Sequence, residues 1–388
     1  MDSIVDQIRS LVSKANAEEQ LKILNTLNEL QIEFQDPMEH IFGIYCSIVQ
    51  VASIKIAVDL GLFRKLAALG KGSSRTVVQL SQDTGADPEL LARILRFLAS
   101  VRYVQEVGID TYTAGKFTYI LAHNHTEAAV VHVTGLMNPV LNSTPDFLAE
   151  TGYKNITDTA KTPFQKAFNT ELKPFEWLPQ HPKLFASMQV VMTSLQSSNW
   201  TEGFDVFDKK IKSLSATTTR PSEPPFFVDV GGGYGHQCVQ LLKKYPCLHG
   251  RLILEDLPEA IEKAERVDGI KYLTQDFFEP QTVKAAKFYY MRRILHDWPD
   301  DDCVKIFKRL ADALGVDSKI LLDEVVLPDT GAYWQSTLAD LTMMVSFAGA
   351  ERTSRKWHEI ADRAGLKISQ VHVFDVRQGY AITILEKA

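Results

Sequence analysis

Apolar residues recur at helical spacing at the beginning of the chain. Ile4, Ile8 and Leu11 lie three or four residues apart, and the same spacing returns after residue 22. The sequence therefore predicts one or two amphipathic helices over residues 2–34. They end before Pro37, because the residue that precedes a proline avoids the helical conformation.

The stretch from residue 38 to residue 70 predicts a more apolar helix. Ile41, Ile44, Ile48 and Val51 fall on more than one of its faces. A helix that is apolar on several sides must be buried, either within its own subunit or against a partner.

Residues 76–117 predict two short helices followed by a hairpin. The second helix begins at Asp87-Pro88, where an N-cap residue precedes a proline at the first helical position. Strand-like runs then flank Gly108-Ile109-Asp110, which is typical of a hairpin turn. This winged-helix pattern suits either DNA binding or a structural, dimerising module. The second use is favoured, because the second helix offers only Arg93 and Arg96 as basic residues.

Residues 119–212 are predicted to be mostly helical, with many large apolar side chains. These side chains either form core or line a pocket for a flat, apolar substrate, since ligand pockets are lined mainly by apolar groups. Residues 213–225 are polar and rich in proline, so we expect a linker there. The large side chains are Phe164, Phe168, Phe175, Trp177, Phe185, Met188, Met192 and Trp200.

After the linker, strand-like apolar runs alternate with helical segments. This alternation predicts an α/β domain with a mostly parallel, doubly wound sheet. The predicted organisation is a mainly helical, winged-helix dimerisation domain (1–118), a helical connecting and substrate-lining segment (119–212), the linker, and the α/β domain (226–388). The predicted strands are Phe226–Val230, Arg251–Leu254, Lys271–Leu273, Phe288–Met291, Lys319–Leu322, Val371–Val376 and Tyr380–Leu385.

Composition disfavours several classes of protein. The net charge of −6, from 42 basic and 48 acidic residues, argues against a general nucleic-acid binder. No uninterrupted apolar run reaches the roughly 18 residues that a membrane span needs. No cysteine pair has the C-x-x-C spacing of a zinc or redox site. We therefore expect a cytoplasmic protein with reduced thiols and no membrane segment.

A glycine-rich turn spans residues 228–235, between a predicted strand and a predicted helix. Glycines permit positive φ angles and let the backbone approach a ligand closely, so Gly231, Gly232 and Gly233 are candidate cofactor-binding residues. The spacing departs from the dinucleotide fingerprint G-x-G-x-x-G, because His236 stands where the last glycine is required.

Acidic residues follow at the ends of the next two predicted strands. Asp256, in the pair Glu255-Asp256, can accept hydrogen bonds from two ribose hydroxyls. Asp276-Phe277 offers a carboxylate and a ring to the edge and the face of an adenine. The series predicts a nucleoside-type cofactor at one edge of the sheet.

A histidine and two glutamates complete the candidate site: His296 in Leu-His-Asp-Trp, Glu324 after an apolar run, and Glu351 in Glu-Arg-Thr. An imidazole near its ordinary pKa of about 6.5 can accept a proton, and a phenol with a pKa near ~10 becomes a better nucleophile when a base takes its proton. Either glutamate can fix the imidazole tautomer. Arg352 and Thr353 are expected to fix the start of the next helix. No metal is expected, because the three residues lack a ligand spacing.

Together these motifs resemble the class I S-adenosylmethionine-dependent O-methyltransferases of the caffeate type, in their fungal secondary-metabolism branch. The resemblance covers residues 226–388 closely, and the winged helix and the region of Phe175-Glu-Trp177 are also similar to this branch. It implies a Rossmann-like domain that binds S-adenosylmethionine, with the glycine turn at the methionine end. Asp256 would bind the ribose. Arg292 stands where plant members have a cofactor-contacting lysine, and the two side chains differ in geometry.

The resemblance also implies a reaction and an assembly. His296 would be the general base for methylation of a phenolic or enolic hydroxyl on a small aromatic, polyketide-type or alkaloid-type substrate. Asp276 with Phe277 would hold the adenine. The N-terminal region would form an intertwined homodimer, which would bury residues 38–70.

Two other functions compete with methyl transfer. Some fungal relatives keep the fold and the cofactor but catalyse dehydrations or pericyclic rearrangements. The intact His296, Glu324 and Glu351 favour methyl transfer over that alternative. A DNA-binding regulator that uses the winged helix is disfavoured by the acidic charge of the chain.

Overall fold

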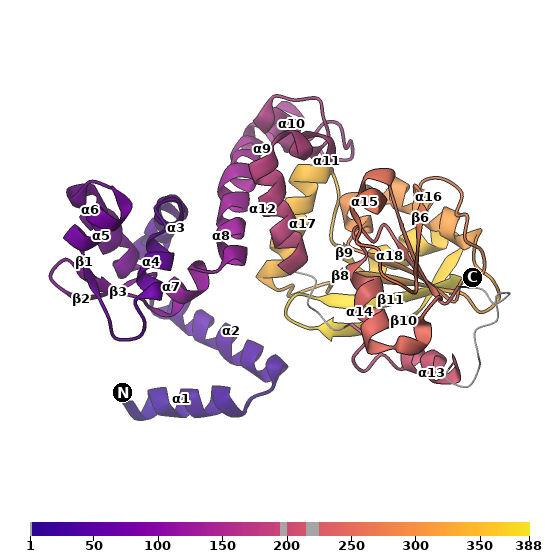
Figure 1. Cartoon of the computed structure of the whole chain (residues 1–388), viewed down its shortest axis with the longest axis horizontal. Coiled ribbons are helices and arrows are strands. Elements are labelled where there is room, and N and C mark those ends of the chain that lie inside the picture. The colour runs from indigo at the N-terminus through magenta and orange to yellow at the C-terminus, as the bar shows by residue number, and fades with distance from the viewer. Residues whose placement is uncertain (1, 195–199, 215–224) are drawn as a thin grey trace. The chain divides into compact units, whose positions relative to one another are not determined.

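The computed structural model describes residues 2–194, 200–214 and 225–388 (Figure 1). Most of the predicted linker over residues 213–225 lies outside these ranges, since residues 215–224 are not described.

The chain divides into two compact units. The first unit comprises Met1–Ser143 and Pro174–Ser197, and the second comprises Thr144–Lys173 and Ser198–Ala388. The expected connecting segment, residues 119–212, thus contributes to both units. The predicted domain boundaries stay a prediction.

Helices dominate the first unit, and polar side chains cap the starts of several of them, including the N-cap that was predicted at Asp87. Asn16 and Glu19 form a capping box at the start of α2, and the carboxylates of Asp36 and Asp87 accept backbone N–H bonds at the starts of α3 and α6. The predicted amphipathic region is confirmed as two separate helices. The helices are α1 (Asp2–Lys14), α2 (Ala17–Phe34), α3 (Pro37–Asp59), α4 (Leu62–Ala68), α5 (Val77–Thr84), α6 (Pro88–Ser100), α7 (Lys116–Leu121), α8 (Asn124–His132), α11 (Pro174–Trp177) and α12 (Pro182–Ser194), with a π-helical turn at Val133–Met137 and a 3₁₀ turn at Leu178–Gln180.

A small antiparallel sheet in the order β1-β3-β2 completes the first unit. The predicted hairpin is confirmed as β2 (Gln105–Gly108) and β3 (Thr111–Thr113), and β1 (Arg75–Thr76) pairs with β3. Tyr112 of β3 is fully buried in one core with side chains of α4, α5 and α6.

The helix α3 is apolar and exposed. Ile41, Phe42, Tyr45 and Ile48 are each more than half exposed within the chain. Burial within the subunit, one of the two possibilities for this stretch, therefore does not hold for these side chains. Among the described residues, α3 is also the one helix long and apolar enough to cross a membrane, by length and composition only.

The second unit is built on an eight-stranded mixed sheet. Its order is β10-β11-β8-β7-β4-β5-β6, with the short β9 paired to β8. Strands β4 to β8 are parallel, and the last two strands are antiparallel to their neighbours. The strands are β4 (Phe227–Val230), β5 (Leu252–Asp256), β6 (Ile270–Thr274), β7 (Phe288–Arg292), β8 (Lys319–Leu327), β9 (Arg352–Thr353), β10 (Leu366–Asp375) and β11 (Tyr380–Lys387).

Helices cover both faces of this sheet, because its central strands are apolar on both sides. One face packs on α16 and α18, and the other packs on α13, α14 and α15. The predicted doubly wound, mostly parallel sheet is confirmed. The helices are α10 (Pro163–Phe168), α13 (Asp205–Leu214), α14 (His236–Lys244), α15 (Pro258–Lys263), α16 (Asp300–Ala311), α17 (Trp334–Phe347) and α18 (Ser354–Arg363), with 3₁₀ turns at Pro246–Leu248 and Leu295–Asp297; α9 (Asn138–Glu150) spans the division between the units.

The strand order reverses beside β4. The chain runs from β4 outward to β5 and β6, and then returns to place β7 on the other side of β4. In open sheets of this kind, ligands bind beyond the carboxyl ends of the strands at such a reversal. The glycine turn, Asp256, Asp276, Arg292 and His296 end or follow strands on this edge, whereas Glu324 lies within β8 and Glu351 directly precedes β9.

Candidate functional site

The glycine turn directly follows β4. Gly231 and Gly233 adopt φ angles of 68° and 61°, a region that residues with a Cβ rarely enter. The N–H groups of Gly231 and Gly232 donate to the Glu255 carbonyl at 2.8 and 3.2 Å. These bonds tie the turn to the end of β5.

Gly232 is required for a different reason. A Cβ at this position would lie 2.4 Å from Cγ of Asp229 and 2.6 Å from Cδ1 of Leu254. The space is thus filled by the chain itself, and the buried Asp229 carboxyl, whose pKa burial raises to about 7, lies under the turn.

Asp256 connects β5 to the glycine turn. Its Oδ2 accepts the N–H of Gly233 at 2.7 Å, and its Oδ1 accepts the N–H of Leu257 at 2.7 Å. Burial raises the pKa of this carboxyl, although the two N–H groups oppose the change. The carboxylate is thereby fixed at the mouth of the turn, with lone pairs left for further donors.

Asp276 and Phe277 follow β6 as predicted. Asp276 is exposed, and its Oδ1 accepts the N–H of Phe278 at 2.9 Å. The ring of Phe277 lies 3.5 Å from the place of a Cβ on Gly231. The structure therefore brings Phe277 next to the glycine turn and leaves Asp276 at the surface.

His296 lies in the 3₁₀ turn between β7 and α16. Its Nδ1 is 2.8 Å from Glu351 Oε1 and 3.9 Å from Glu324 Oε2, and its Nε2 is 3.6 Å from Asp297 Oδ1. A carboxylate can only accept, so Nδ1 carries a proton and donates it to Glu351. The structure thus gathers the three predicted residues, although two of them come from distant segments.

The two glutamates make different contacts. Oε1 of Glu324 accepts the backbone N–H groups of Ile294 and Leu295 at 3.0 and 2.8 Å. Glu324 therefore anchors the turn that carries His296, while Glu351 contacts the imidazole itself. The sequence left this division open.

The charge around His296 overturns one expectation. Burial alone would lower the pKa of His296, but the carboxylates of Glu324, Asp297 and Glu351 together raise it to about 10. Burial raises the pKa of Glu324 to about 7 and that of Asp297 to about 6, against the opposing charge of His296. At neutral pH the isolated site therefore holds an imidazolium, not the free imidazole of pKa about 6.5 that the sequence suggested.

Arg292 ends β7 on the face of the sheet opposite to the α16 core. Its side chain is largely buried, and Nη1 lies 3.5 Å from Oδ2 of Asp323. The same carboxylate accepts the hydroxyl of Tyr290. Arg292 and the glycine turn lie at the ends of the adjacent strands β7 and β4. This strand pairing is the relation between them that the structure shows.

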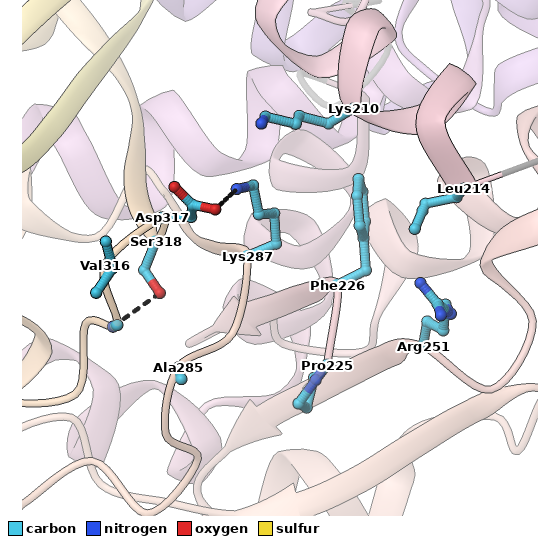
Figure 2. A pocket seen from close by; sticks show the side chains of 11 residues that line it. Lys210, Leu214, Pro225, Phe226, Arg251, Ala285, Lys287, Val316, Asp317 and Ser318 are labelled. Carbon is cyan, nitrogen blue, oxygen red and sulfur yellow. Dashed lines mark hydrogen bonds and ion pairs between the residues drawn. The ribbon is translucent and has the colours of Figure 1, made fainter. Parts of the chain in front are cut away.

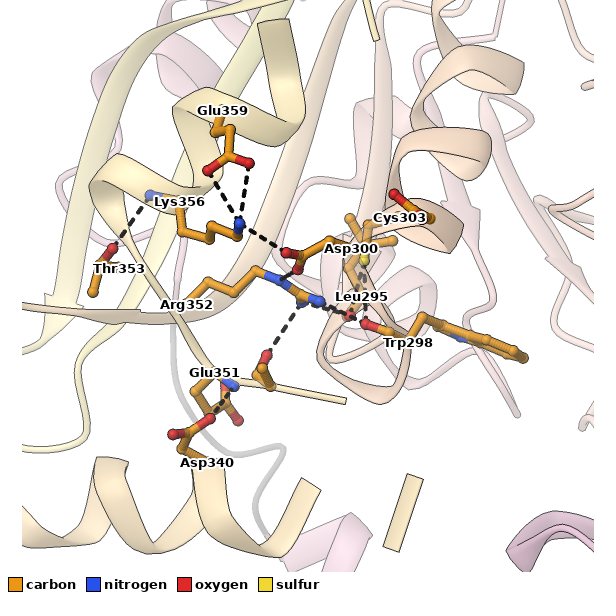
Figure 3. A network of polar contacts seen from close by, with 12 residues as sticks. Leu295, Trp298, Asp300, Cys303, Asp340, Glu351, Arg352, Thr353, Lys356 and Glu359 are labelled. Atoms are coloured by element: carbon orange, nitrogen blue, oxygen red, sulfur yellow. Dashed lines mark hydrogen bonds and ion pairs between the residues drawn. The ribbon is translucent and has the colours of Figure 1, made fainter. Parts of the chain in front are cut away.

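Sequence reasoning missed two residues that frame His296, Gly349 and Asp340, and it gave a third, Arg352, a different role. A Cβ on Gly349 would lie 1.9 Å from the carbonyl oxygen of His296. Asp340 of α17 accepts the N–H of Glu351 at 2.9 Å, and Arg352 contacts the His296 turn (Figure 3). A signal existed for Gly349, since it precedes the Glu-Arg-Thr motif; Asp340 carried none.

The gathered residues also form a group that could hold a metal ion. Ligand atoms of His296, Glu324 and Glu351 lie within 4.8 Å of one another. Their sequence spacing hid this arrangement, because β8 and the segment before β9 meet only in the fold. The expectation that no metal takes part in the reaction stays a prediction.

A cavity of about 460 Å³ lies at the other edge of the sheet (Figure 2). Its lining includes Phe226, Arg251, Lys287 and Ser318, each of which immediately precedes a parallel strand. The carboxyl ends of those strands carry the candidate site, so this cavity is separate from it.

The chain is similar to known enzymes over its whole length. The O-methyltransferase domain family matches residues 155–367. Demethylsterigmatocystin 6-O-methyltransferase of Aspergillus flavus is 36% identical over 387 residues, which cover 100% of this chain and 98% of that protein.

Solved structures are also similar to the chain over its whole length. The structure of LepI in complex with SAM has a TM-score of 0.87 at 33% identity and covers 100% of this chain and 98% of that one. The structure of a pericyclic reaction enzyme also has a TM-score of 0.87 at 33% identity, with 100% and 99% covered.

These similarities confirm the resemblance that the glycine turn, the strand-end acids and the His296 motif carry. The family match spans more than half of the chain, and the relative is matched end to end. The chain therefore belongs to the O-methyltransferase family, and its cofactor is S-adenosylmethionine.

Proposed function

We propose that the chain methylates a phenolic or enolic hydroxyl of a small secondary metabolite, with His296 as the general base. As a member of its family, the chain is an S-adenosylmethionine-dependent O-methyltransferase. One observation carries the finer proposal: His296 Nδ1 lies 2.8 Å from Glu351 Oε1, at the strand edge where the cofactor turn lies. Because Nδ1 donates to Glu351, Nε2, which lies 3.6 Å from Oδ1 of Asp297, is the ring nitrogen that can take the acceptor's proton.

The residues at the glycine turn fit the cofactor. A Cβ on Gly233 would meet nothing within 4 Å, so the turn has an open side beside the Asp256 carboxylate. Asp256 keeps lone pairs for two ribose hydroxyls, and the ring of Phe277 suits an adenine face. We assign Gly231, Gly232 and Gly233 to the methionine end, where Gly232 acts by leaving room for Asp229. Arg292 and Asp276 complete the proposed set.

The proton follows a defined route. The bound sulfonium supplies an electrophilic methyl group. Nε2 of His296 takes the hydroxyl proton as the acceptor oxygen forms its bond to the methyl carbon and the carbon–sulfur bond breaks. Glu351 holds the ring and stabilises the imidazolium that results. Alignment of the oxygen with the methyl group supplies the rest of the rate.

The raised pKa of His296 is compatible with this role. A conjugate acid with a pKa of about 10 matches a phenol with a pKa near ~10, so the proton moves between partners of similar basicity. A phenolate bound to the imidazolium has the same total number of protons as a phenol bound to the neutral base. Either route reaches the same reacting state.

We further propose that the protein is a cytoplasmic homodimer. The exposed apolar side chains of α3, such as Phe42, Tyr45 and Ile48, suit burial against a second copy. The helices and hairpin of residues 76–117 fit a winged-helix module that serves this assembly. The proposed acceptor is an aromatic, polyketide-type or alkaloid-type molecule, and a relative of the chain is a 6-O-methyltransferase of demethylsterigmatocystin.

A second candidate function is a pericyclic or dehydrating reaction at the same site. The pericyclic reaction enzyme that the chain is similar to favours it. In that case the charges of the cofactor and the imidazolium would polarise the substrate, and no methyl group would move.

The deciding experiment uses S-adenosylmethionine with a ¹³C-labelled methyl group and a panel of phenols and enols. Mass spectrometry of the products separates the candidates: a labelled ether supports methyl transfer, and an unlabelled rearranged or dehydrated product supports the second function. His296→Ala should abolish transfer and still bind S-adenosylhomocysteine. His249→Ala, which changes a largely exposed histidine, is the matched control. Near-normal methylation by His296→Ala would contradict the role as base.

A further inference from the structure

We infer that Arg352 is a positioning residue, which clamps the turn carrying His296 to the segment carrying Glu351. The inference rests on the proposed role of His296 as the base and deepens it. Arg352 is 3% exposed. Its partners in the described part of the chain are backbone carbonyls, one carboxylate and one ring, so it acts through other residues.

The guanidinium of Arg352 bridges the His296 turn from both sides. Nη1 donates to the carbonyl of Leu295 at 2.9 Å, and Nη2 donates to the carbonyl of Trp298 at 2.6 Å (Figure 3). One acceptor precedes His296 and the other follows it. The two bonds therefore fix the peptide segment on which the imidazole stands.

The rest of the guanidinium anchors this bridge to the start of α16. Nε donates to Oδ1 of Asp300 at 2.8 Å, and Lys356 holds the other oxygen of Asp300 at 2.9 Å. The guanidinium also lies 5.1 Å from the ring of Trp357. A planar fork with fixed donor directions makes such contacts at once, whereas the single ammonium of a lysine cannot.

The Glu351 segment is held against the same turn by its backbone. The N–H of Ala350 donates to the carbonyl of His296 at 2.9 Å, and Asp340 accepts the N–H of Glu351. Nη1 of Arg352 also donates to the carbonyl of Ala350 at 3.2 Å. Arg352 therefore contacts both segments that must meet to form the His296–Glu351 hydrogen bond.

The turn depends on such contacts because it has little structure of its own. It is a 3₁₀ turn of three residues, Leu295–Asp297, and short 3₁₀ turns have poor internal hydrogen-bond geometry. A displacement of 1 Å in a catalytic group costs on the order of 10²-fold in rate. The clamp is thus placed where a small shift has a large effect.

The test compares Arg352→Lys and Arg352→Met with Arg355→Met, which removes an arginine whose side chain is 85% exposed. The first measurement is the His296 pKa, obtained by NMR titration of the full-length protein with labelled histidine and assigned with His296→Ala. Loss of a nearby positive charge alone would raise this pKa. Displacement of Glu351 would lower it. We expect Arg352→Lys, which keeps the charge, and Arg352→Met both to lower it.

Kinetics supply the second measurement. We expect kcat to fall on the order of 10²-fold in Arg352→Met and less in Arg352→Lys. The affinity for S-adenosylhomocysteine should change less than about twofold, as for Arg355→Met, since Arg352 is remote from the glycine turn in the contacts it makes. The NMR titration needs no acceptor, so it tests the clamp even if methyl transfer itself proves wrong.

Two results would overturn the inference. One is an unchanged or raised His296 pKa in both variants. The other is a kcat that falls only in proportion to the folded fraction, measured by thermal unfolding. Should Arg352→Met fail to fold, Arg352→Lys alone decides, because any decrease in the His296 pKa then reflects geometry and not lost charge.

Discussion

Glu351 Oε1 lies 2.8 Å from His296 Nδ1, although 55 residues separate the two in the chain. Glu324 is also near the ring, with Oε2 3.9 Å from Nδ1 of His296, but its other oxygen, Oε1, accepts two backbone N–H groups of the turn. The pair His296–Glu351 therefore sets the ring orientation, and Glu324 sets the position of the peptide beneath it. Substitution of either glutamate should therefore have a different effect on the rate.

Glu351→Ala should lower kcat by about 10-fold to 100-fold, the usual cost of removing a residue that orients a reacting group. Glu324→Gln should lower it less, because an amide oxygen still accepts from Ile294 and Leu295. Steady-state kinetics of both variants, with the S-adenosylhomocysteine affinity as a control for folding of the site, check this order. An equal decrease in kcat in the two variants would contradict the separate roles, and would mean that both glutamates act only through their negative charge.

The pH dependence of kcat/KM should rise through the neutral range. The carboxylates around His296 raise its pKa to about 10, so its neutral form becomes abundant only as the pH approaches that value. For a phenolic acceptor we expect about a tenfold gain per pH unit between about pH 7 and 9. Glu324→Gln removes a negative charge beside the ring, so the rise of kcat/KM with pH should occur at lower pH in this variant. A plateau beginning near pH 6.5 would contradict the raised pKa.

Gly349→Ala should destabilise the second unit and disturb the turn. The added Cβ would lie 1.9 Å from the His296 carbonyl oxygen and 2.9 Å from the Asp297 carbonyl carbon, and backbone cannot yield as a flexible side chain does. Overpacking of this kind costs about 1–3 kcal/mol, which corresponds to a decrease of several degrees in Tm. Calorimetric melting of the variant measures it.

The control for this change is Gly115→Ala. Gly115 has a φ of −102°, and a Cβ there would meet nothing nearer than 4.0 Å. Its Tm should stay close to that of the wild type. A similar decrease in both variants would mean that loss of glycine, and not the clash at His296, is the cause.

The strands and the edge that carries the site could be predicted from local patterns. Buried parallel strands read as apolar runs, and acids such as Asp256 follow them at the place where such sheets bind ligands. What local patterns could not give was the meeting of segments far apart in sequence. Three features depend on the pairing of β8 with β9. They are the cluster of His296, Glu324 and Glu351, the different contacts that the two glutamates make, and the contacts of Arg352 with the His296 turn.

Side-chain direction was a second limit. Arg352 and Thr353 were both expected at the start of the next helix, and Thr353 does cap α18 through Lys356 N at 3.2 Å. Arg352 precedes Thr353 in β9, and successive side chains of a strand point to opposite faces. The side chain of Arg352 therefore points toward the His296 turn and not toward the start of α18. The pKa of His296 was missed for a related reason, since it depends on three carboxylates that only the fold brings together.

Asp256→Asn should weaken cofactor binding. Both oxygens of Asp256 already accept backbone N–H groups, from Gly233 and Leu257. An asparagine would turn its NH₂ group toward one of those donors, and it would offer fewer lone pairs to two ribose hydroxyls. Hydrogen bonds to a charged group contribute about 1.5–3 kcal/mol, so the Kd for S-adenosylhomocysteine should rise by about 10-fold to 100-fold. Titration calorimetry measures this directly. Asp268→Asn, at a side chain that is almost fully exposed, should bind as the wild type does, and an unchanged Kd in Asp256→Asn would refute the ribose assignment.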